Sequence, residues 1–291
     1  MSTFLQSVIF GLSSGATFAL LALSISLVFT TTGAVNFATA SMGTLCAFLF
    51  FWASTTLGLG WVAGLAIALV GSAVLGALVE RGIVRPLAGA DLFRVVLATM
   101  GLDILLNNGT QHVFGSGVRP LGLPLPTGAW NVFGLSVDIG RLFLIAVALV
   151  LVVALAAVLR GTRLGVGMRA YAQDPRAAAL MGIPERTVTR WTWILASVLG
   201  TVGALLVSGV TVLGVGAIEP TFIQAFTAAV LGGLASLSGA VVGGLVLGVL
   251  GALSTTYAPE AVTTILPLVI ILAMLLLRPA GLFGRAAAER A

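Results

Sequence analysis

The stretch FLQSVIFGLSSGATFALLALSISLVF, residues 4–29, is an apolar run long enough to cross a lipid bilayer. A membrane-spanning helix needs about 20 such residues, because each adds about 1.5 Å of rise across a hydrocarbon layer about 30 Å thick. The run contains no charged side chain, and the first charged residue of the chain is Glu80. We therefore expect the segments before Glu80 to lie in a membrane.

The composition extends this conclusion to the whole chain. The 291 residues are 59% hydrophobic and 8% charged, and the mean hydropathy is +1.17. Soluble domains carry about 25% charged residues, so the composition indicates a multi-pass membrane protein. The pI of about 11.0 does not indicate nucleic-acid binding, because the arginines are spread thinly among the apolar runs.

Several chemistries are excluded by missing residue types. The chain has no lysine, which excludes a phosphate-binding loop of the G-x-x-x-x-G-K-[ST] type. One cysteine, Cys46, and one histidine, His112, exclude an internal disulfide and a Cys/His zinc site. We therefore expect no catalytic residues, no metal site and no ATP hydrolysis on this chain.

The apolar runs and the arginines together predict the topology. Further runs fall at 36–53, 61–79, 95–113, 139–159, 191–213, 222–237, 239–257 and 262–277. Twelve of the 14 arginines lie in 80–94, in 160–190 or after 277, which the positive-inside rule places in the cytoplasm together with the C-terminus. The sequence predicts an all-α polytopic bundle of eight or nine membrane segments, forming a single domain over 1–291. Nine segments put the N-terminus outside, whereas a re-entrant 36–53 would put it inside.

Two features refine this bundle. An even number of crossings between Arg190 and Arg278 requires a break in 222–257, which we expect at the glycine- and serine-rich segment 232–239. Small residues four apart, such as Gly11 with Gly15 and Gly244 with Gly248, allow close helix contact in a membrane, although such pairs also occur in ordinary bundle packing. The stretch 114–138, between the apolar runs 95–113 and 139–159, is expected to be an external interfacial loop.

The cytoplasmic segment 160–190 contains a short helix signal. Asp174 is a suitable N-cap and Pro175 a suitable first helical residue, while Gly182 and Pro184 would end the helix. The residues between include Arg176, Ala177, Ala178 and Leu180, which favour a helix of about two turns. So short a helix needs packing to be stable, so it lies either on the lipid interface or against a cytoplasmic partner.

Four segments resemble permeases of ATP-binding-cassette (ABC) importers, in the same order and spacing. Over nearly its whole length the chain resembles the H-type permease subunit of branched-chain amino acid importers. The segments are GLSSGATFALLALSISLVFTTTGAVNFATASMGTLCAF at 11–48, RAYAQDPRAAALMGI at 169–183, AFTAAVLGGLASLSGAVVGGLVLG at 225–248 and LLLRPAGLFG at 275–284.

The resemblance implies a function and a set of partners. It implies a permease subunit in the bacterial inner membrane that translocates branched-chain or other hydrophobic amino acids, delivered by an external binding protein. The helix at 174–182 would then dock two separate ATPase subunits, which bind ATP and Mg²⁺, and a second permease subunit would complete the membrane assembly. Urea, short amides or another small polar solute is an alternative cargo. A stand-alone secondary transporter or channel is an alternative class.

Polar residues within apolar runs are the candidates for the substrate path, because such groups are costly in hydrocarbon. Asp103 and Asn107 are spaced so that they share one helix face with Gln111. This face could line the path, could hold helices together with Asp103 paired to Arg94, or could belong to a proton relay. The remaining candidates are Thr31, Asn36, Gln224, Ser236 and Ser238.

Overall fold

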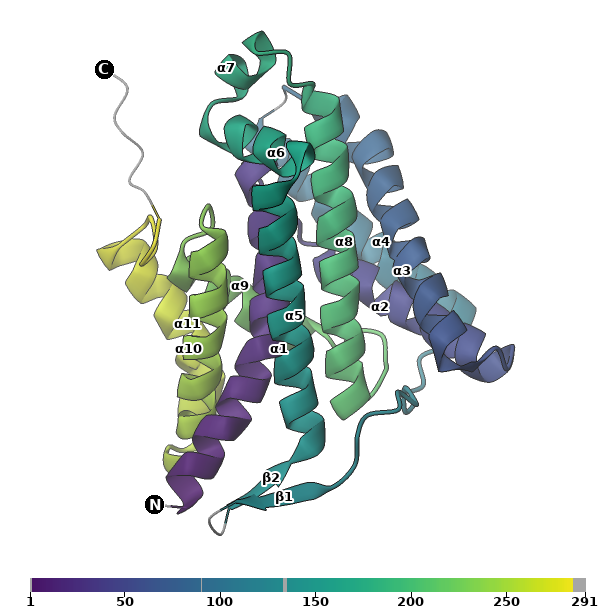
Figure 1. Cartoon of the computed structure of the whole chain (residues 1–291), viewed down its shortest axis with the longest axis vertical. Coiled ribbons are helices and arrows are strands. Elements are labelled where there is room, and N and C mark those ends of the chain that lie inside the picture. Colours follow the sequence, from purple (N-terminus) through teal and green to yellow (C-terminus); the bar gives the residue numbers. More distant parts are fainter. Residues whose placement is uncertain (1, 90, 133–134, 285–291) are drawn as a thin grey trace.

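The computed structural model describes residues 2–89, 91–132 and 135–284. These residues form long helices and one small β-hairpin (Figure 1). The helices are α1 (Ser2–Thr32), α2 (Thr39–Phe51), α3 (Gly60–Val79), α4 (Leu92–Phe114), α5 (Ile139–Gly161), α6 (Arg163–Gln173), α7 (Pro175–Leu180), α8 (Glu185–Val210), α9 (Glu219–Gly232), α10 (Leu237–Tyr257) and α11 (Glu260–Leu277). Short π-helical or 3₁₀ turns at Trp52–Thr56, Glu80–Val84 and Arg85–Leu87 extend α2 and α3.

Every apolar run in the sequence forms a helix, which confirms the predicted all-α membrane bundle. Seven helices in the described part of the chain are long and apolar enough to cross a membrane, close to the predicted eight or nine. The two remaining runs form α2, with 13 residues and continued by the π-helical turn Trp52–Thr56, and α9, with 14 residues. Neither is among the seven helices that are long and apolar enough to cross a membrane. Run 36–53 is shortened because residues 33–38 form an irregular connection between α1 and α2. The predicted break at 232–239 lies between α9 and α10.

Helix α1 occupies the centre of the bundle and packs against α5, α8, α9 and α10. Glycines bring α1 and α10 into backbone contact. A β-carbon on Gly248 would lie 2.3 Å from the α-carbon of Gly15, and one on Gly15 would lie 2.8 Å from the carbonyl oxygen of Gly244. Such distances leave no room for any side chain, so the predicted small-residue pairs are true contact points between these helices.

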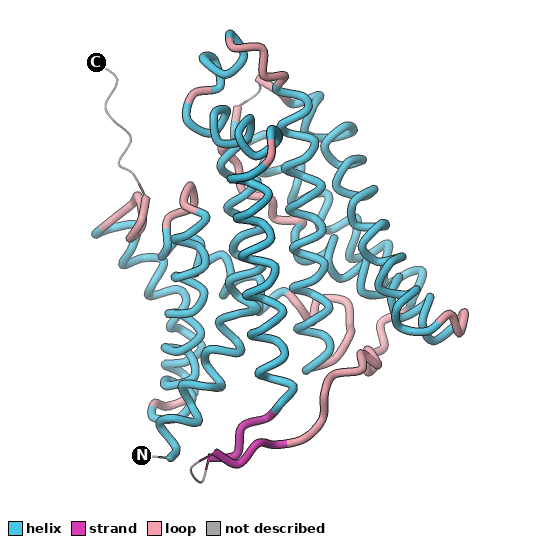
Figure 2. Tube along the Cα trace, in the orientation of Figure 1, coloured by secondary structure: helices cyan, strands magenta, loops and turns pink. Residues whose placement is uncertain are grey.

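The two ends of the bundle differ in structure (Figure 2). At one end, here called the hairpin end, the start of α1 lies near strands β1 (Ala129–Val132) and β2 (Leu135–Asp138), which pair antiparallel with Ala129 opposite Asp138. At the other end, the α7 end, helices α6 and α7 project beyond α5 and α8. The segment predicted as a loop thus contains a hairpin. A backbone bridge between Arg119 and Leu213 also ties this segment to the α8–α9 connection.

The chain after α11 returns to the α9–α10 turn. The backbone N–H groups of Leu282 and Phe283 donate to the carbonyl oxygens of Leu231 and Gly232, at 2.9 and 3.0 Å. These carbonyl groups belong to the last turn of α9 and would otherwise lack helical partners. The closing motif therefore caps the short helix α9. Arg285 and Arg290, counted above in the basic tail, lie outside the described residues.

Candidate functional site

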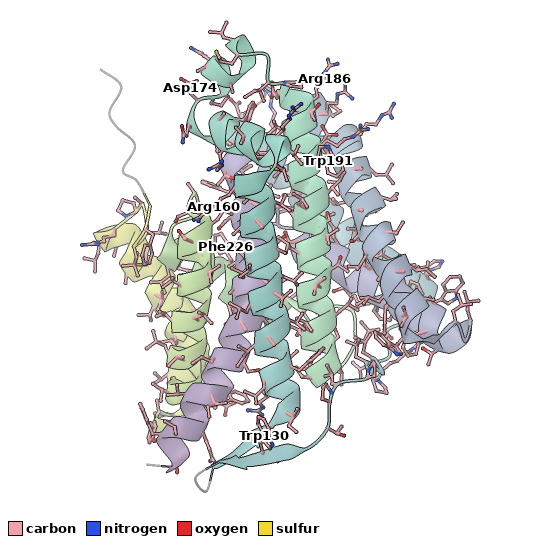
Figure 3. All side chains as sticks on the ribbon, viewed as in Figure 1. Trp130, Arg160, Asp174, Arg186, Trp191 and Phe226 are labelled. Atoms are coloured by element: carbon pink, nitrogen blue, oxygen red, sulfur yellow. The ribbon has the colours of Figure 1, made fainter. Side chains whose placement is uncertain are left out.

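The predicted helix in the cytoplasmic loop is confirmed as α7. The Asp174 carboxylate oxygen accepts hydrogen bonds from the backbone N–H groups of Arg176 and Ala177, at 2.9 and 3.1 Å, and Pro175 is the first helical residue. Gly182 follows the helix with φ of +79°, a left-handed conformation that favours glycine. Asp174, labelled in Figure 3, lies in the segment that projects beyond the ends of the long helices.

Helix α7 presents an apolar tip to its surroundings. The side chains of Leu180 and Met181 are 89% and 82% exposed. Arg176 and Ala177 are also exposed, whereas Ala178 is buried against the rest of the chain. Of the residues predicted to dock a partner, Arg176, Ala177 and Leu180 are therefore exposed, whereas Ala178 packs α7 against the rest of the chain.

Helix α6, which the sequence analysis did not predict, supports α7. Its start is capped by Thr162, whose hydroxyl accepts a hydrogen bond of 3.0 Å from the Gly165 N–H. Near its end, burial and then the hydrogen bond and charge of Glu185 raise the pKa of Tyr171 to about 12. Glu185 is the first residue of α8, so this contact joins α6 to α8. The projecting helix pair α6–α7, here called the peg, is therefore held against α8, a membrane-spanning helix.

The connection between α1 and α2 has a well-defined shape. The Asn36 side chain is buried, and its carboxamide oxygen accepts a hydrogen bond of 3.1 Å from the Ala38 N–H. Its backbone oxygen accepts from the hydroxyl of Thr39 at 2.8 Å. The Thr31 hydroxyl donates to the Val28 carbonyl oxygen of its own helix at 3.1 Å. Asn36 thus stabilises the irregular connection between α1 and α2, here called the α1–α2 break, whereas the Thr31 hydroxyl finds its hydrogen-bond partner within α1.

This break lies between α4 and α9. The backbone N–H of Phe37 donates to the Thr99 hydroxyl of α4 at 3.4 Å. The Phe37 ring contacts the rings of Phe222 and Phe226 on α9, with centroid distances of 6.2 and 6.1 Å. An apolar aromatic cluster therefore flanks a segment of irregular backbone inside the bundle.

A polar cluster joins α4 to the start of α9. The Asn107 amide nitrogen donates to the Asp103 carboxylate at 3.3 Å and to the Glu219 carboxylate at 3.1 Å. Asp103 therefore contacts Asn107, and within the described residues no ion pair joins it to Arg94. The sequence analysis did not identify Glu219, which lies between the predicted apolar runs 191–213 and 222–237. An acidic residue followed by Pro220 at the start of an apolar run was the available signal for a helix beginning here.

The other candidate residues lie elsewhere. Gln224 lines a groove between α1, α10 and α11. Ser236 is the N-cap of α10, with its hydroxyl accepting a hydrogen bond of 3.1 Å from Gly239, and Ser238 lies 3.5 Å from the Ser236 hydroxyl. The structure thus brings Asp103 and Asn107 together with Glu219. Asp103 lies four residues along α4 from Thr99, which accepts the hydrogen bond from Phe37 in the connection between α1 and α2. The structure separates this cluster from Gln224 and from the serine pair.

A bundle of apolar spanning helices with two short internal helices, irregular backbone in its interior and a projecting helix pair defines a multi-pass membrane transport protein. Residues 7–277 match the family described as branched-chain amino acid transport system / permease component. The chain belongs to this family.

Individual relatives cover nearly the whole chain. It is 30% identical to the high-affinity branched-chain amino acid transport system permease protein LivH of Escherichia coli, over 99% of this chain and 97% of the relative. Identity to the corresponding permease protein BraD of Pseudomonas aeruginosa is 28%, over 99% and 98%. A probable branched-chain amino acid transport permease of Methanocaldococcus jannaschii is 27% identical, over 91% of this chain.

Proposed function

We propose that this chain is the permease subunit of an ABC importer that carries branched-chain or other hydrophobic amino acids across the bacterial inner membrane. The observation that carries the proposal is the exposed tip of α7, with Leu180 and Met181 held outward on a supported peg. Two apolar side chains this exposed on a rigid helix suit insertion into a groove of a partner. Family membership and the names of the relatives support the same assignment.

The proposal assigns the energy source to other subunits. A chain without lysine has no Walker-type phosphate-binding loop, so two separate ATPase subunits would bind ATP and Mg²⁺ and dock at α7. The α7 end would then be cytoplasmic, in agreement with the arginines of segments 80–94 and 160–190. The C-terminus would lie on the same side, and the hairpin end would face outward. There the segment 114–138 and the α8–α9 connection would contact the substrate-binding protein.

The substrate path would pass the junction of α4, α9 and the α1–α2 break. A zwitterionic amino acid with an aliphatic side chain needs acceptors for its ammonium group and an apolar surface for its side chain. Asp103 and Glu219 provide the acceptors, and Phe37 and Phe222 provide the surface. The N-terminus of α9 carries a positive partial charge that suits a carboxylate. A second permease subunit would complete the path.

Reconstitution tests this proposal. The tagged chain would be purified with its associated subunits and placed in liposomes that contain ATP on the ATPase side. We expect uptake of radiolabelled leucine that needs ATP and the binding protein, and much weaker uptake of urea. Uptake of urea in preference to leucine would assign another cargo to the same importer class. Uptake by the purified chain alone, driven by a pH gradient without ATP, would contradict the importer assignment and identify a secondary transporter.

A further inference from the structure

A cavity opens at the hairpin end, between the starts of α1 and α5, the end of α10 and the β-hairpin. Its volume is about 560 Å³, and most of its lining side chains are polar. The residues that matter for the argument are Gln6, Ser7, Phe10, Asp138, Arg141 and Thr255. None of them belongs to the proposed substrate path or to α7.

The cavity holds one positive and one negative side chain. Nε of Arg141 lies 3.9 Å from the Asp138 carboxylate, a distance longer than a hydrogen bond. The Arg141 guanidinium lies over the Phe10 ring, 4.1 Å from its centroid, which fixes the cation at the cavity wall. The Arg141 side chain is 38% exposed and the Asp138 side chain is 56% exposed. The guanidinium therefore retains donors for an anionic group, and the carboxylate retains an acceptor for a cationic group.

A second groove, of about 140 Å³, adjoins this cavity along the helices. The two share Phe10, Ala252 and Thr255 in their walls. The groove is lined about equally by polar and apolar surface, and the bulky apolar side chains Phe18, Leu247 and Leu266 stand in its wall. The charged cavity at the end of the bundle thus adjoins a groove between α1, α9, α10 and α11 whose described lining residues include no charged side chain.

The depth of the combined groove matches one leaflet of a bilayer. It is lined from Thr3 to Phe18 on α1, and these 15 steps correspond to about 22 Å of helix. One leaflet contributes about 15 Å of hydrocarbon plus its headgroup layer. The exposed Trp130 of β1, labelled in Figure 3, lies at the hairpin end, where tryptophan favours the interface between lipid and water. This match assigns the charged pair to the headgroup level and the second groove, with Phe18 and Leu247, to the level of the acyl chains.

We propose that this continuous groove binds a single phospholipid with a phosphoethanolamine headgroup. The lipid phosphate would contact Arg141 and the nearby hydroxyl groups, and its ammonium group would contact Asp138. One acyl chain would follow the groove past Phe10 to Phe18 and Leu247. A headgroup with both charges complements this pair, whereas an anionic glycerol headgroup leaves Asp138 unmatched and a trimethylated headgroup cannot donate a hydrogen bond to it.

Native mass spectrometry of the delipidated full chain tests the site, with synthetic phosphatidylethanolamine, phosphatidylcholine or phosphatidylglycerol as the added lipid. We expect one phosphatidylethanolamine to bind about tenfold more tightly than the other two lipids. Arg141→Gln should abolish this preference. Arg119→Gln is the matched control, because Arg119 also lies over an aromatic ring, that of Phe51 at 5.4 Å, and is absent from the groove.

Gly251→Leu tests the groove without touching the charged pair. A β-carbon at Gly251 meets no atom within 4 Å, so the larger side chain should fill the groove rather than disturb the bundle. We expect this variant to retain its thermal stability and to lose the tightly bound lipid. Equal binding of all three lipids, or an unchanged preference in both variants, would show an annular lipid only and overturn the proposal. Binding of free phosphoethanolamine as tight as that of the lipid, or displacement of the lipid by leucine, would also overturn it.

Discussion

The amide nitrogen of Asn107, on α4, donates a hydrogen bond of 3.1 Å to the carboxylate of Glu219, the first residue of α9. The two residues are 112 positions apart in the chain, and this bond joins the first residue of a short helix to α4. The same nitrogen also donates to Asp103. One neutral side chain thus stands between two carboxylates, which reduces their mutual repulsion and holds both near the proposed path.

Asn107→Leu should disrupt the polar cluster of Asp103, Asn107 and Glu219. The substitution keeps the approximate size of the side chain but removes both hydrogen bonds, leaving two carboxylates without their shared donor. Because a hydrogen bond to a charged group contributes about 1.5–3 kcal/mol, we expect leucine uptake to fall at least about tenfold at equal protein levels. Initial rates of ATP-dependent uptake in proteoliposomes measure the effect.

Asn108→Leu is the control for this substitution. Its amide donates only to the Ile104 carbonyl oxygen of the same helix, at 2.7 Å, and its side chain is exposed. Uptake by this variant should remain close to normal. Equal losses in the two variants would mean that α4 tolerates no leucine on this helix turn, and would remove the support for a specific role of Asn107.

The contrast between α7 and this cluster shows what a sequence can predict. Helix α7 was predicted with its cap and its end because Asp174, Pro175 and Gly182 act on neighbouring backbone groups, and such signals are local. The local sequence at Glu219 indicates the start of a helix but not the contact that this residue makes. Its partner Asn107 lies on a distant helix, and the position of α9 depends on the packing of the whole bundle.

The same reasoning explains the two short helices. Hydropathy counts apolar residues whether or not they are helical, so it predicts a full membrane segment at 222–237 and, unless the segment is re-entrant, another at 36–53. In the structure Asn36 turns the chain by accepting a hydrogen bond from the Ala38 N–H, and Gly233 ends α9 with φ of +104°. These are backbone events that leave the hydropathy of a segment nearly unchanged.

Leu180→Asp tests the docking role of α7. The side chain is 89% exposed, so a carboxylate there costs the isolated permease little, whereas it would be buried and unpaired in an apolar groove of a partner. We expect normal amounts of the permease in the membrane, at least about tenfold less co-purified ATPase, and loss of ATP-driven uptake.

Two further aspartate substitutions separate docking from folding. Ala172→Asp places the same charge at an exposed position on α6, outside α7, and should leave ATPase binding intact. Ala178→Asp places the charge at a buried position and should destabilise the packing of α7 against the rest of the chain. If Leu180→Asp retained its ATPase and its uptake, α7 would not be the docking element.

Gly248→Val should weaken the contact between α1 and α10. The new β-carbon would lie 2.4 Å from the carbonyl oxygen of Gly11 and still closer to Gly15, so the helices must separate. Overpacking of this kind costs about 1–3 kcal/mol, which should lower the thermal unfolding temperature in detergent. Gly251→Ala, on the same helix with no atom within 4 Å of the added carbon, should leave that temperature unchanged or raise it. Similar unfolding temperatures for the two variants would contradict close packing at Gly248.

The link between α6 and α8 predicts a dependence on pH. Burial and the neighbouring Glu185 raise the pKa of Tyr171 from its ordinary value of 10.0 to about 12, so the fold favours the protonated phenol. The resulting stabilisation is fully present below about pH 10 and is lost as the pH rises from about 10 to 12, because ionisation then puts a charge at a buried position and beside the Glu185 carboxylate. We therefore expect the α6–α7 peg to stay attached to α8 throughout the physiological range.

Tyrosinate absorbance measures this directly, because the chain has only two tyrosines. In a Tyr257→Phe background the remaining signal belongs to Tyr171, and its midpoint should fall near pH 12. Adding Glu185→Gln removes the negative charge but not the burial, so the midpoint should move part of the way back toward 10. A midpoint near 10 in the single variant would mean that Tyr171 is solvated and that α6 is not fixed to α8. Protease digestion at pH 8 would then be expected to cut the α6–α7 segment as readily as an unstructured loop.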